Sequence, residues 1–195
     1  MPRKNTRNTR GKIVSAAWKL FYEQGYENTT VEDIIFESET SKGTFYHYFE
    51  GKDALLGTLS TLFDEKYEAL IKVMEPDANA IDTLHWLNRE LFAMVDSSVP
   101  IELLGGLLST QLTTKGEKHL LDRNRLYFRL LREIIVKGQE KGEIRDDFSV
   151  NEITKAYALM ERALMYDWCL CSGEYSLVKY SDTMMGIFLD GYRKK

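Results

Sequence analysis

The amino-acid sequence predicts an all-α protein built from nine helices. Three observations lead to this fold class. Apolar residues recur at the three- and four-residue spacing of a helix through most of the 195 residues. The chain contains only three prolines, which break helices, and several long segments contain none. No segment shows the alternation of apolar and polar residues that is typical of a half-buried strand.

The first three helices are expected over residues 7–23, 31–38 and 41–48. Gly25 follows the first helix, at a position where a left-handed residue often ends a helix. Thr30 and Asp33 have the spacing of a capping box and open the second. The third helix is too short to be stable alone, so it must pack on the other two.

Six further helices follow. They are expected over residues 52–74, 78–97, 100–113, 116–141, 150–172 and 176–193. Pro76 ends the first of these, and Pro100 suits the first turn of the third. Segment 141–147 interrupts the helical periodicity before the last two helices.

The distribution of charge is more informative than the net charge of −4, which argues against a general nucleic-acid coat. Residues 1–19 contain six basic residues and no acidic one. They are Arg3, Lys4, Arg7, Arg10, Lys12 and Lys19. A basic arm on an otherwise acidic chain is typical of local contact with DNA, and the alternative is a solvated, disordered tail.

Several other classes of protein find no support in the sequence. Cys169 and Cys171 are two residues apart, a spacing at which they do not face each other on a helix, so we expect no disulfide framework and a cytoplasmic protein. The three histidines are scattered, which predicts no metal site. Neither a transmembrane segment nor a signal peptide is visible. We expect no catalytic residues and no cofactor, because no catalytic triad, paired-carboxylate motif or phosphate loop is present.

A helix-turn-helix motif is predicted where the second and third helices meet. Segments 29–35, 40–49 and 52–56 read TTVEDII, TSKGTFYHYF and KDALL. They closely resemble the signature of the tetracycline-repressor (TetR) family, and the resemblance is strong over about residues 10–56. It implies a DNA-binding helix-turn-helix domain over 1–50, including the basic arm, and a helical regulatory and dimerisation domain over 51–195.

The third helix carries the candidate DNA-reading residues. Its side chains are mostly polar or aromatic, and its apolar side is little more than Phe45, so it needs an outside partner such as a major groove. Within the family resemblance, some of these residues contact base edges and others contact phosphate and the groove wall. The first group is Lys42, Gly43 and Thr44, and the second is Tyr46, His47 and Tyr48, with Ser41 at the start of the helix.

Two further DNA contacts are expected at helix N-termini. Lys52 would oppose the dipole of its own helix unless a phosphate docks there, and the alternative is a solvated surface lysine. Thr30 is an N-cap that offers a second such site.

The turn between the two helices departs from the family pattern. The family commonly has Ala-Gly-Val, whereas this chain has Ser38, Glu39 and Thr40. If Glu39 adopts the positive φ of the usual glycine, the strain costs about 1 kcal/mol.

The last two helices are apolar on two faces, so each needs a second partner besides the core of its own chain. The resemblance implies a four-helix bundle in a homodimer, and the alternative is a large monomeric core. Candidate interface residues are Ala163, Met185 and Leu189.

The middle helices, in the family, enclose a pocket for an inducer. The candidates to line it are Trp86, Phe92, Leu107, Gln111, Tyr127 and Glu161. Gly105 and Gly106 leave either space for a ligand or room for close helix packing. We therefore expect a repressor that binds a pseudo-palindromic operator as a dimer and is released by a small apolar or aromatic inducer. The alternatives are a DNA-binding regulator without such a ligand and an all-α carrier.

Overall fold

The computed structural model describes residues 6–113 and 118–194, which form an all-α fold as predicted. Regular structure within these two ranges consists of ten α-helices and one 3-10 helix. Their bounds are α1 (Thr6–Gln24), α2 (Val31–Glu37), α3 (Lys42–Tyr48), α4 (Lys52–Leu56), α5 (Leu59–Ile71), α6 (Ala80–Ser98), α7 (Ile101–Thr113), η1 (His119–Leu121), α8 (Leu126–Glu140), α9 (Val150–Leu170) and α10 (Leu177–Asp190). The described residues contain one isolated β-bridge, between Ile144 and Arg193. Arg3 and Lys4 of the basic arm lie outside them.

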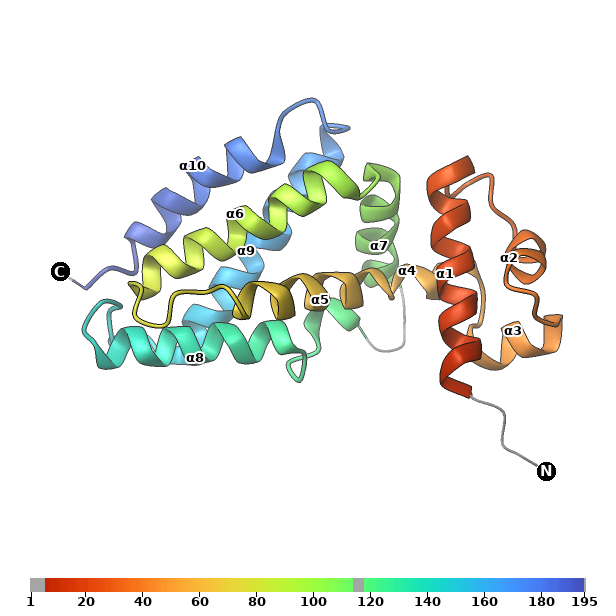
Figure 1. The fold of residues 1–195 in the computed structure, drawn as a ribbon. Helices are drawn as coiled ribbons and strands as arrows, with labels where there is room; N and C mark the ends of the chain where they lie inside the picture. Colours follow the sequence, from red (N-terminus) through yellow and green to blue (C-terminus); the bar gives the residue numbers. More distant parts are fainter. Residues whose placement is uncertain (1–5, 114–117, 195) are drawn as a thin grey trace.

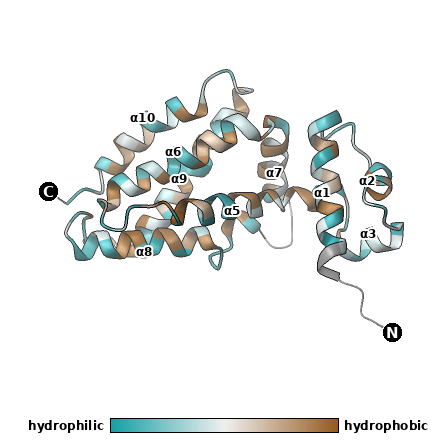
Figure 2. Ribbon diagram, in the orientation of Figure 1, coloured by the Kyte–Doolittle hydropathy of each residue, from teal (hydrophilic) through white to brown (hydrophobic). Residues whose placement is uncertain are grey.

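The helices lie in two groups (Figure 1). Helices α1 to α3 form a small bundle at one end, and α5 to α10 form a larger group at the other, with α4 between them. Within the larger group α10 lies along α6, and α8 packs on α9. Hydrophobic and hydrophilic segments alternate along most helices (Figure 2), as expected when each helix buries one face.

The expected fourth helix is interrupted at Gly57 and Thr58, which corrects the prediction of one continuous helix to residue 74. The Thr58 hydroxyl donates to the Leu55 carbonyl over 2.6 Å, and the Thr58 N–H donates to the same carbonyl over 2.9 Å. A Cβ at Gly57 would lie 2.7 Å from Cδ2 of His119, so this break is also a point of close approach. Glycine beside a hydroxyl residue is a known cause of a helix kink.

The expected helix 116–141 starts later than predicted. Residues 116 and 117 lie outside the described ranges, the short helix η1 follows, and α8 begins only at Leu126. The Asn124 N–H donates to the Asp122 carboxylate over 2.9 Å, a local bond that favours a turn over a helix.

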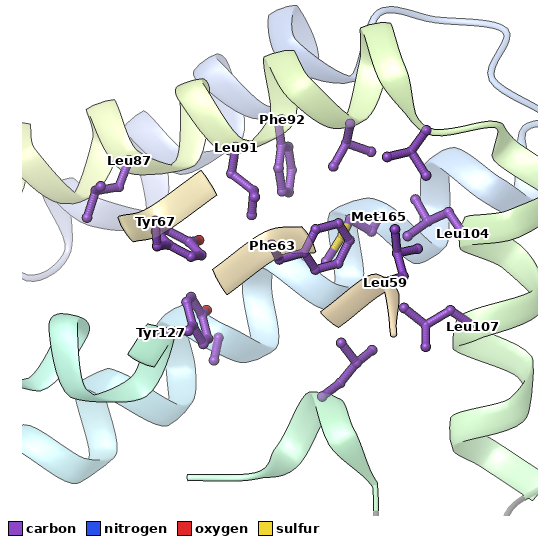
Figure 3. Close-up of a cluster of buried hydrophobic side chains, with 14 of the residues drawn as sticks. Leu59, Phe63, Tyr67, Leu87, Leu91, Phe92, Leu104, Leu107, Tyr127 and Met165 are labelled. Carbon is purple, nitrogen blue, oxygen red and sulfur yellow. The ribbon is translucent and has the colours of Figure 1, made fainter. Parts of the chain in front are cut away.

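One continuous apolar core runs from the small bundle into the larger group. In Figure 3, side chains from α5 lie among residues of α6, α7, α8 and α9. Those labelled are Leu59, Phe63, Tyr67, Leu87, Leu91, Phe92, Leu104, Leu107, Tyr127 and Met165. A Cβ at Gly106 would lie 3.1 Å from Leu56, whereas one at Gly105 would meet nothing within 4 Å. Close packing therefore accounts for Gly106 but not for Gly105.

No single helix in the described ranges is long and apolar enough to cross a membrane. By length and composition, α6 and α7 together would pass such a test, as a pair bent by 116°.

Candidate DNA interface and regulatory core

The turn between α2 and α3 is held by a residue in the left-handed conformation. Glu39 has φ +52°. Around it, the Thr40 N–H donates to the Ile35 carbonyl and the Glu39 N–H donates to the Phe36 carbonyl, each over 3.1 Å. These bonds end α2 as a left-handed C-terminal cap does, although a glycine is more usual in that position. Glu39 therefore adopts the positive φ that the sequence left open as one possibility.

Local capping bonds set the start of each of these helices. Thr30 Oγ1 accepts from the Asp33 N–H over 3.1 Å, and the Asp33 carboxylate accepts from the Thr30 N–H over 2.8 Å. Ser41 Oγ accepts from the Thr44 N–H over 3.1 Å. The predicted capping box is confirmed, and the Thr30 and Ser41 hydroxyls are both engaged in capping.

Helix α3 buries a single side chain among its seven residues, that of Phe45. Phe49 follows the helix and is also buried. The other side chains are exposed or partly exposed, and the aromatic Tyr46 and His47 are among the exposed ones. This matches the sequence interpretation of a helix anchored by phenylalanine and otherwise open to a partner.

Lys42 lies at the start of α3 and forms an ion pair with Glu32 of α2. Its Nζ is 3.0 Å from Oε1 of Glu32, and both side chains are 67% exposed. The hydrogen bond from Lys42 holds the pKa of the Glu32 carboxyl below its usual value. Exposed pairs of this kind contribute little to stability, so Lys42 can exchange Glu32 for another anion at small cost.

Lys52 is held by the loop that follows α1. Its Nζ donates to the Tyr26 carbonyl over 2.7 Å and lies 4.2 Å from the centre of the Tyr26 ring. The Tyr26 hydroxyl in turn donates to Asp53. Lys52 is therefore not a solvated surface lysine, because its ammonium group already has a hydrogen-bond acceptor within the chain.

Phe36 is a feature of this surface that the sequence interpretation missed. Its side chain is 86% exposed, on the same side of α2 as Glu32 four residues earlier. The exposure of Phe36 could have been predicted from the sequence. Ile34 and Ile35 define the buried side of α2, and Phe36 lies outside that side.

A buried polar cluster lies at the centre of the larger group. The Glu161 carboxylate accepts from the Asn88 side-chain amide over 3.0 Å and from the Tyr127 hydroxyl over 2.5 Å. Beside it, the Tyr157 hydroxyl donates to the Leu84 carbonyl over 2.8 Å. Burial raises the pKa of the Glu161 carboxyl, and the hydrogen bonds oppose that shift.

Arg125 joins the start of α8 to α5. Its Nε and Nη2 each donate to the Asp64 carboxylate over 2.9 Å, and Nη2 also donates to the Ser60 carbonyl over 2.9 Å. Such a bidentate pair fixes both position and orientation. Arg125 also lines a cavity of about 30 Å³, together with Tyr67, Tyr127 and Glu161.

Comparison with known proteins identifies the family. Residues 13–59 match the sequence model described as "Bacterial regulatory proteins, tetR family". Over these residues the chain belongs to the TetR family of bacterial regulatory proteins. Its match covers the region that forms α2, α3 and α4 and most of α1.

The similarity to some relatives extends beyond the residues that the family model matches. It is 26% identical over 171 residues to the regulator TcmR of Streptomyces glaucescens, a match that covers 84% of this chain and 74% of TcmR. It is 24% identical to the fatty acid metabolism regulator protein of Bacillus subtilis, over 94% of this chain and 95% of that protein.

Solved structures share the fold at low sequence identity. The crystal structure of FadR from Bacillus subtilis in complex with stearoyl-CoA superposes with a TM-score of 0.71 at 20% identity, over 94% of this chain and 100% of FadR. A TetR-family regulator from Pectobacterium atrosepticum superposes with a TM-score of 0.78 at 16% identity, over 100% and 99% of the two chains.

The six pocket candidates do not come together in the structure. Tyr127 and Glu161 line the same small cavity. Phe92 and Leu107 are buried in the apolar core, Trp86 lines a separate groove beside Met74, and Gln111 accepts from the Leu120 N–H over 3.3 Å. Helical periodicity places each residue on an inward face but does not indicate which inward faces meet.

The predicted interface residues need correction. Ala163 is exposed, but Met185 and Leu189 are buried within the single chain. Helix α10 turns that side toward the core because it lies along α6. The apolar side chains left exposed on α9 and α10 are Leu159, Tyr166, Leu170, Tyr180 and Ile187. We call these five, with Ala163, the α9–α10 surface.

Proposed function

We propose that this TetR-family regulator is a cytoplasmic repressor that binds a pseudo-palindromic operator as a homodimer and is released by a small molecule. The observation that carries the DNA-binding part is helix α3, which buries Phe45 and presents the rest of its side chains to the surface. In this proposal residues 1–50 bind DNA, and residues 51–195 regulate that binding and form the dimer.

The DNA contacts are proposed residue by residue. Lys42, Gly43 and Thr44 contact base edges, since they lie at the N-terminal end of the helix that enters the major groove. Tyr46, His47 and Tyr48 contact phosphate and the groove wall. Thr30 and Ser41 present helix N-termini to phosphates, and Lys52 supports the interface through its bond to the Tyr26 carbonyl.

Dimerisation is proposed through the α9–α10 surface. Leu159 and Ile187 are 62% and 68% exposed. Several large apolar side chains at helical spacing on two adjacent helices are typical of a surface that another copy covers. A two-fold dimer also presents two α3 helices, which a pseudo-palindromic operator requires.

Release by a small molecule is supported by the relatives and by the polar contacts of the core. The FadR proteins of Bacillus subtilis and Thermus thermophilus were crystallised with stearoyl-CoA and lauroyl-CoA, respectively. In this chain Arg125 contacts both the central cavity and α5, so a change in the cavity can reach α5 directly.

The interruption between α4 and α5 offers the next step toward DNA. The His119 ring packs on Gly57 at this interruption, and the Trp18 indole N–H of α1 donates to the adjacent Thr58 hydroxyl over 2.8 Å. We propose that movement of α5 is transmitted through this contact to α1 and changes the separation of the two α3 helices.

One observation favours the alternative of a regulator without a small-molecule ligand. The central cavity of about 30 Å³ has room for about one water molecule. A ligand of ordinary size requires this core to expand.

The DNA-binding part is tested by comparing Lys42→Ala with Lys72→Ala, which removes an exposed lysine at the end of α5. Fluorescence anisotropy would measure binding to the operator and to its single-base variants. We expect Lys42→Ala to lose about 1–3 kcal/mol of discrimination at one or two positions, and Lys72→Ala to behave as wild type. Unchanged discrimination in Lys42→Ala would contradict base reading by α3.

A further inference from the structure

Two polar atoms without partners lie near Glu161, one on a residue that lines the central cavity and one on Asn88, which hydrogen-bonds to Glu161. The Tyr67 hydroxyl and the Asn88 side-chain oxygen are buried and make no hydrogen bond. Tyr67 lines the cavity together with Glu161. Leaving such buried groups unpaired is costly, so their presence points to a partner that completes them.

The hydrogen-bonding chemistry of Asn88 decides which of its side-chain atoms is left without a partner. The Glu161 carboxylate can only accept, so the Asn88 amide must turn its NH₂ group toward it, as observed at 3.0 Å. The Asn88 oxygen is then left as an acceptor. The cluster is therefore left with an amide oxygen that can accept, a phenolic hydroxyl that can accept as well as donate, and the remaining lone pairs of a carboxylate.

Glu161 forms no direct ion pair, although the nearby charge of Arg162 favours its ionised form. Glu161 is 2% exposed, and none of the ion pairs formed by the described residues includes it. Arg125, which lines the same cavity, has its charge paired with Asp64. A buried carboxylate without a cation is costly, which makes a cationic ligand complementary to this position.

We propose that the regulating molecule carries an ammonium group that binds in this cavity to Glu161, Asn88 and Tyr67. An ammonium has three donors and no acceptor, which matches the three unmet acceptors. The cavity volume of about 30 Å³ fits a group of this size, and the tyrosine faces of Tyr67 and Tyr127 suit a cation. The apolar part of the molecule contacts side chains such as Phe63 and Met165, which line the same cavity.

The regulatory effect of this ligand rests on the proposed function, because a molecule bound here regulates DNA binding only if the core controls α5. It also sets the chain apart from the FadR proteins, whose acyl-CoA ligands are anionic. Arg162 also lines the cavity, so a carboxylate is the alternative ligand group that the experiment must exclude.

The experiment uses three probes that share one six-carbon chain, namely hexylamine, hexan-1-ol and hexanoate. Isothermal titration calorimetry on the full-length protein measures binding, and fluorescence anisotropy with operator DNA measures release at matched ionic strength. We expect hexylamine to bind at least about tenfold more tightly than the other two, because charged hydrogen bonds are the stronger kind.

Two variants assign the preference to the cluster. Glu161→Gln should abolish the preference for hexylamine over hexan-1-ol, and Tyr67→Phe should reduce it without changing hexan-1-ol binding. Thermal melts of both variants confirm that they are folded. If Glu161→Gln does not fold, Tyr67→Phe alone decides, because it removes only an unpaired hydroxyl.

Equal binding of hexylamine and hexan-1-ol, tighter binding of hexanoate, no binding of any probe, or a preference that survives both variants would each overturn the inference. DNA release by hexanoate alone would overturn it while leaving the proposed function intact. Selective hexylamine binding with no effect on operator affinity would support the inference and contradict ligand release.

Discussion

The indole N–H of Trp18 donates to the Thr58 hydroxyl over 2.8 Å, joining the first helix of the small bundle to the interruption between α4 and α5. The two residues are 40 positions apart in the sequence. Thr58 also donates to the Leu55 carbonyl over 2.6 Å, so one hydroxyl both shapes the interruption and connects it to α1.

Thr58→Val should destabilise the protein by about 1 kcal/mol, because it keeps the side-chain shape but leaves the Trp18 N–H without its acceptor. Trp18→Phe should cost more, since it also removes packing. The double variant should lose less than the sum of the two, as expected for residues in contact. Urea denaturation of the four proteins measures this, and strictly additive losses would contradict coupling through this bond.

Glu39→Gly should leave stability unchanged or increase it. The glycine relieves left-handed strain of about 1 kcal/mol at φ +52°, and the greater freedom of the unfolded chain offsets part of the gain. Ser172→Gly, at φ +51° and far from α3, is the matched control for strain. A clearly lower melting temperature in Glu39→Gly would argue against the left-handed turn.

The same change should tighten DNA binding modestly, because it removes a carboxylate beside the proposed interface. The effect should be largest at low salt, where screening is weak. Glu39→Ala keeps the backbone strain and removes only the charge, so it should tighten binding without stabilising the fold. Operator affinity that does not respond to either variant at any salt concentration would place Glu39 away from DNA.

Ile187→Glu should shift the protein from dimer to monomer while preserving the fold, because the side chain is exposed in the single chain and covered in the proposed dimer. Met185→Glu should instead yield unfolded or insoluble protein, since Met185 is buried within the chain. Sedimentation velocity separates these outcomes. A native dimer in Ile187→Glu would exclude that part of the α9–α10 surface.

Glu161 should make stability depend on pH in the direction opposite to an exposed carboxylate. Its pKa is raised in the folded chain by burial, against about 4.3 when unfolded. Its stabilising contribution is therefore complete below pH ~4.3 and is lost as the pH rises through the raised value. The groups that face it are Tyr127, Tyr157, Asn88 and Arg162.

The melting temperature of Glu161→Gln, measured relative to wild type from pH 4 to 8, should therefore increase with pH. Taking the difference cancels the contributions of remote carboxylates such as Asp146, whose pKa is lowered. A difference that stays constant over this range would show that burial does not shift Glu161.

The features that could be predicted from the sequence are those decided by local interactions. The capping box of Thr30 and Asp33, the single anchor Phe45 and the option of a left-handed turn at Glu39 depend on residues within a few positions of each other. Such interactions leave a recognisable pattern at fixed spacing.

The features that could not be predicted depend on partners distant in the sequence. The interruption at Gly57 lies where the His119 ring packs, about sixty residues away. Likewise, α10 buries Met185 because it lies along α6, whereas its periodicity alone allows either apolar face to be turned inward. The cavity at Glu161 could not be predicted for the same reason, because its lining depends on which inward helix faces meet.

The most direct test of the account is a hydroxyl-radical footprint of the purified protein on its operator, made in parallel with the Tyr46→Ala and Ile187→Glu variants. We predict two protected patches related by two-fold symmetry, with centres about one helical turn of DNA or a multiple of it apart. Tyr46→Ala should weaken both patches equally, and Ile187→Glu should abolish their joint protection. A single asymmetric patch, or protection indifferent to sequence, would contradict a dimeric repressor that reads its operator through α3.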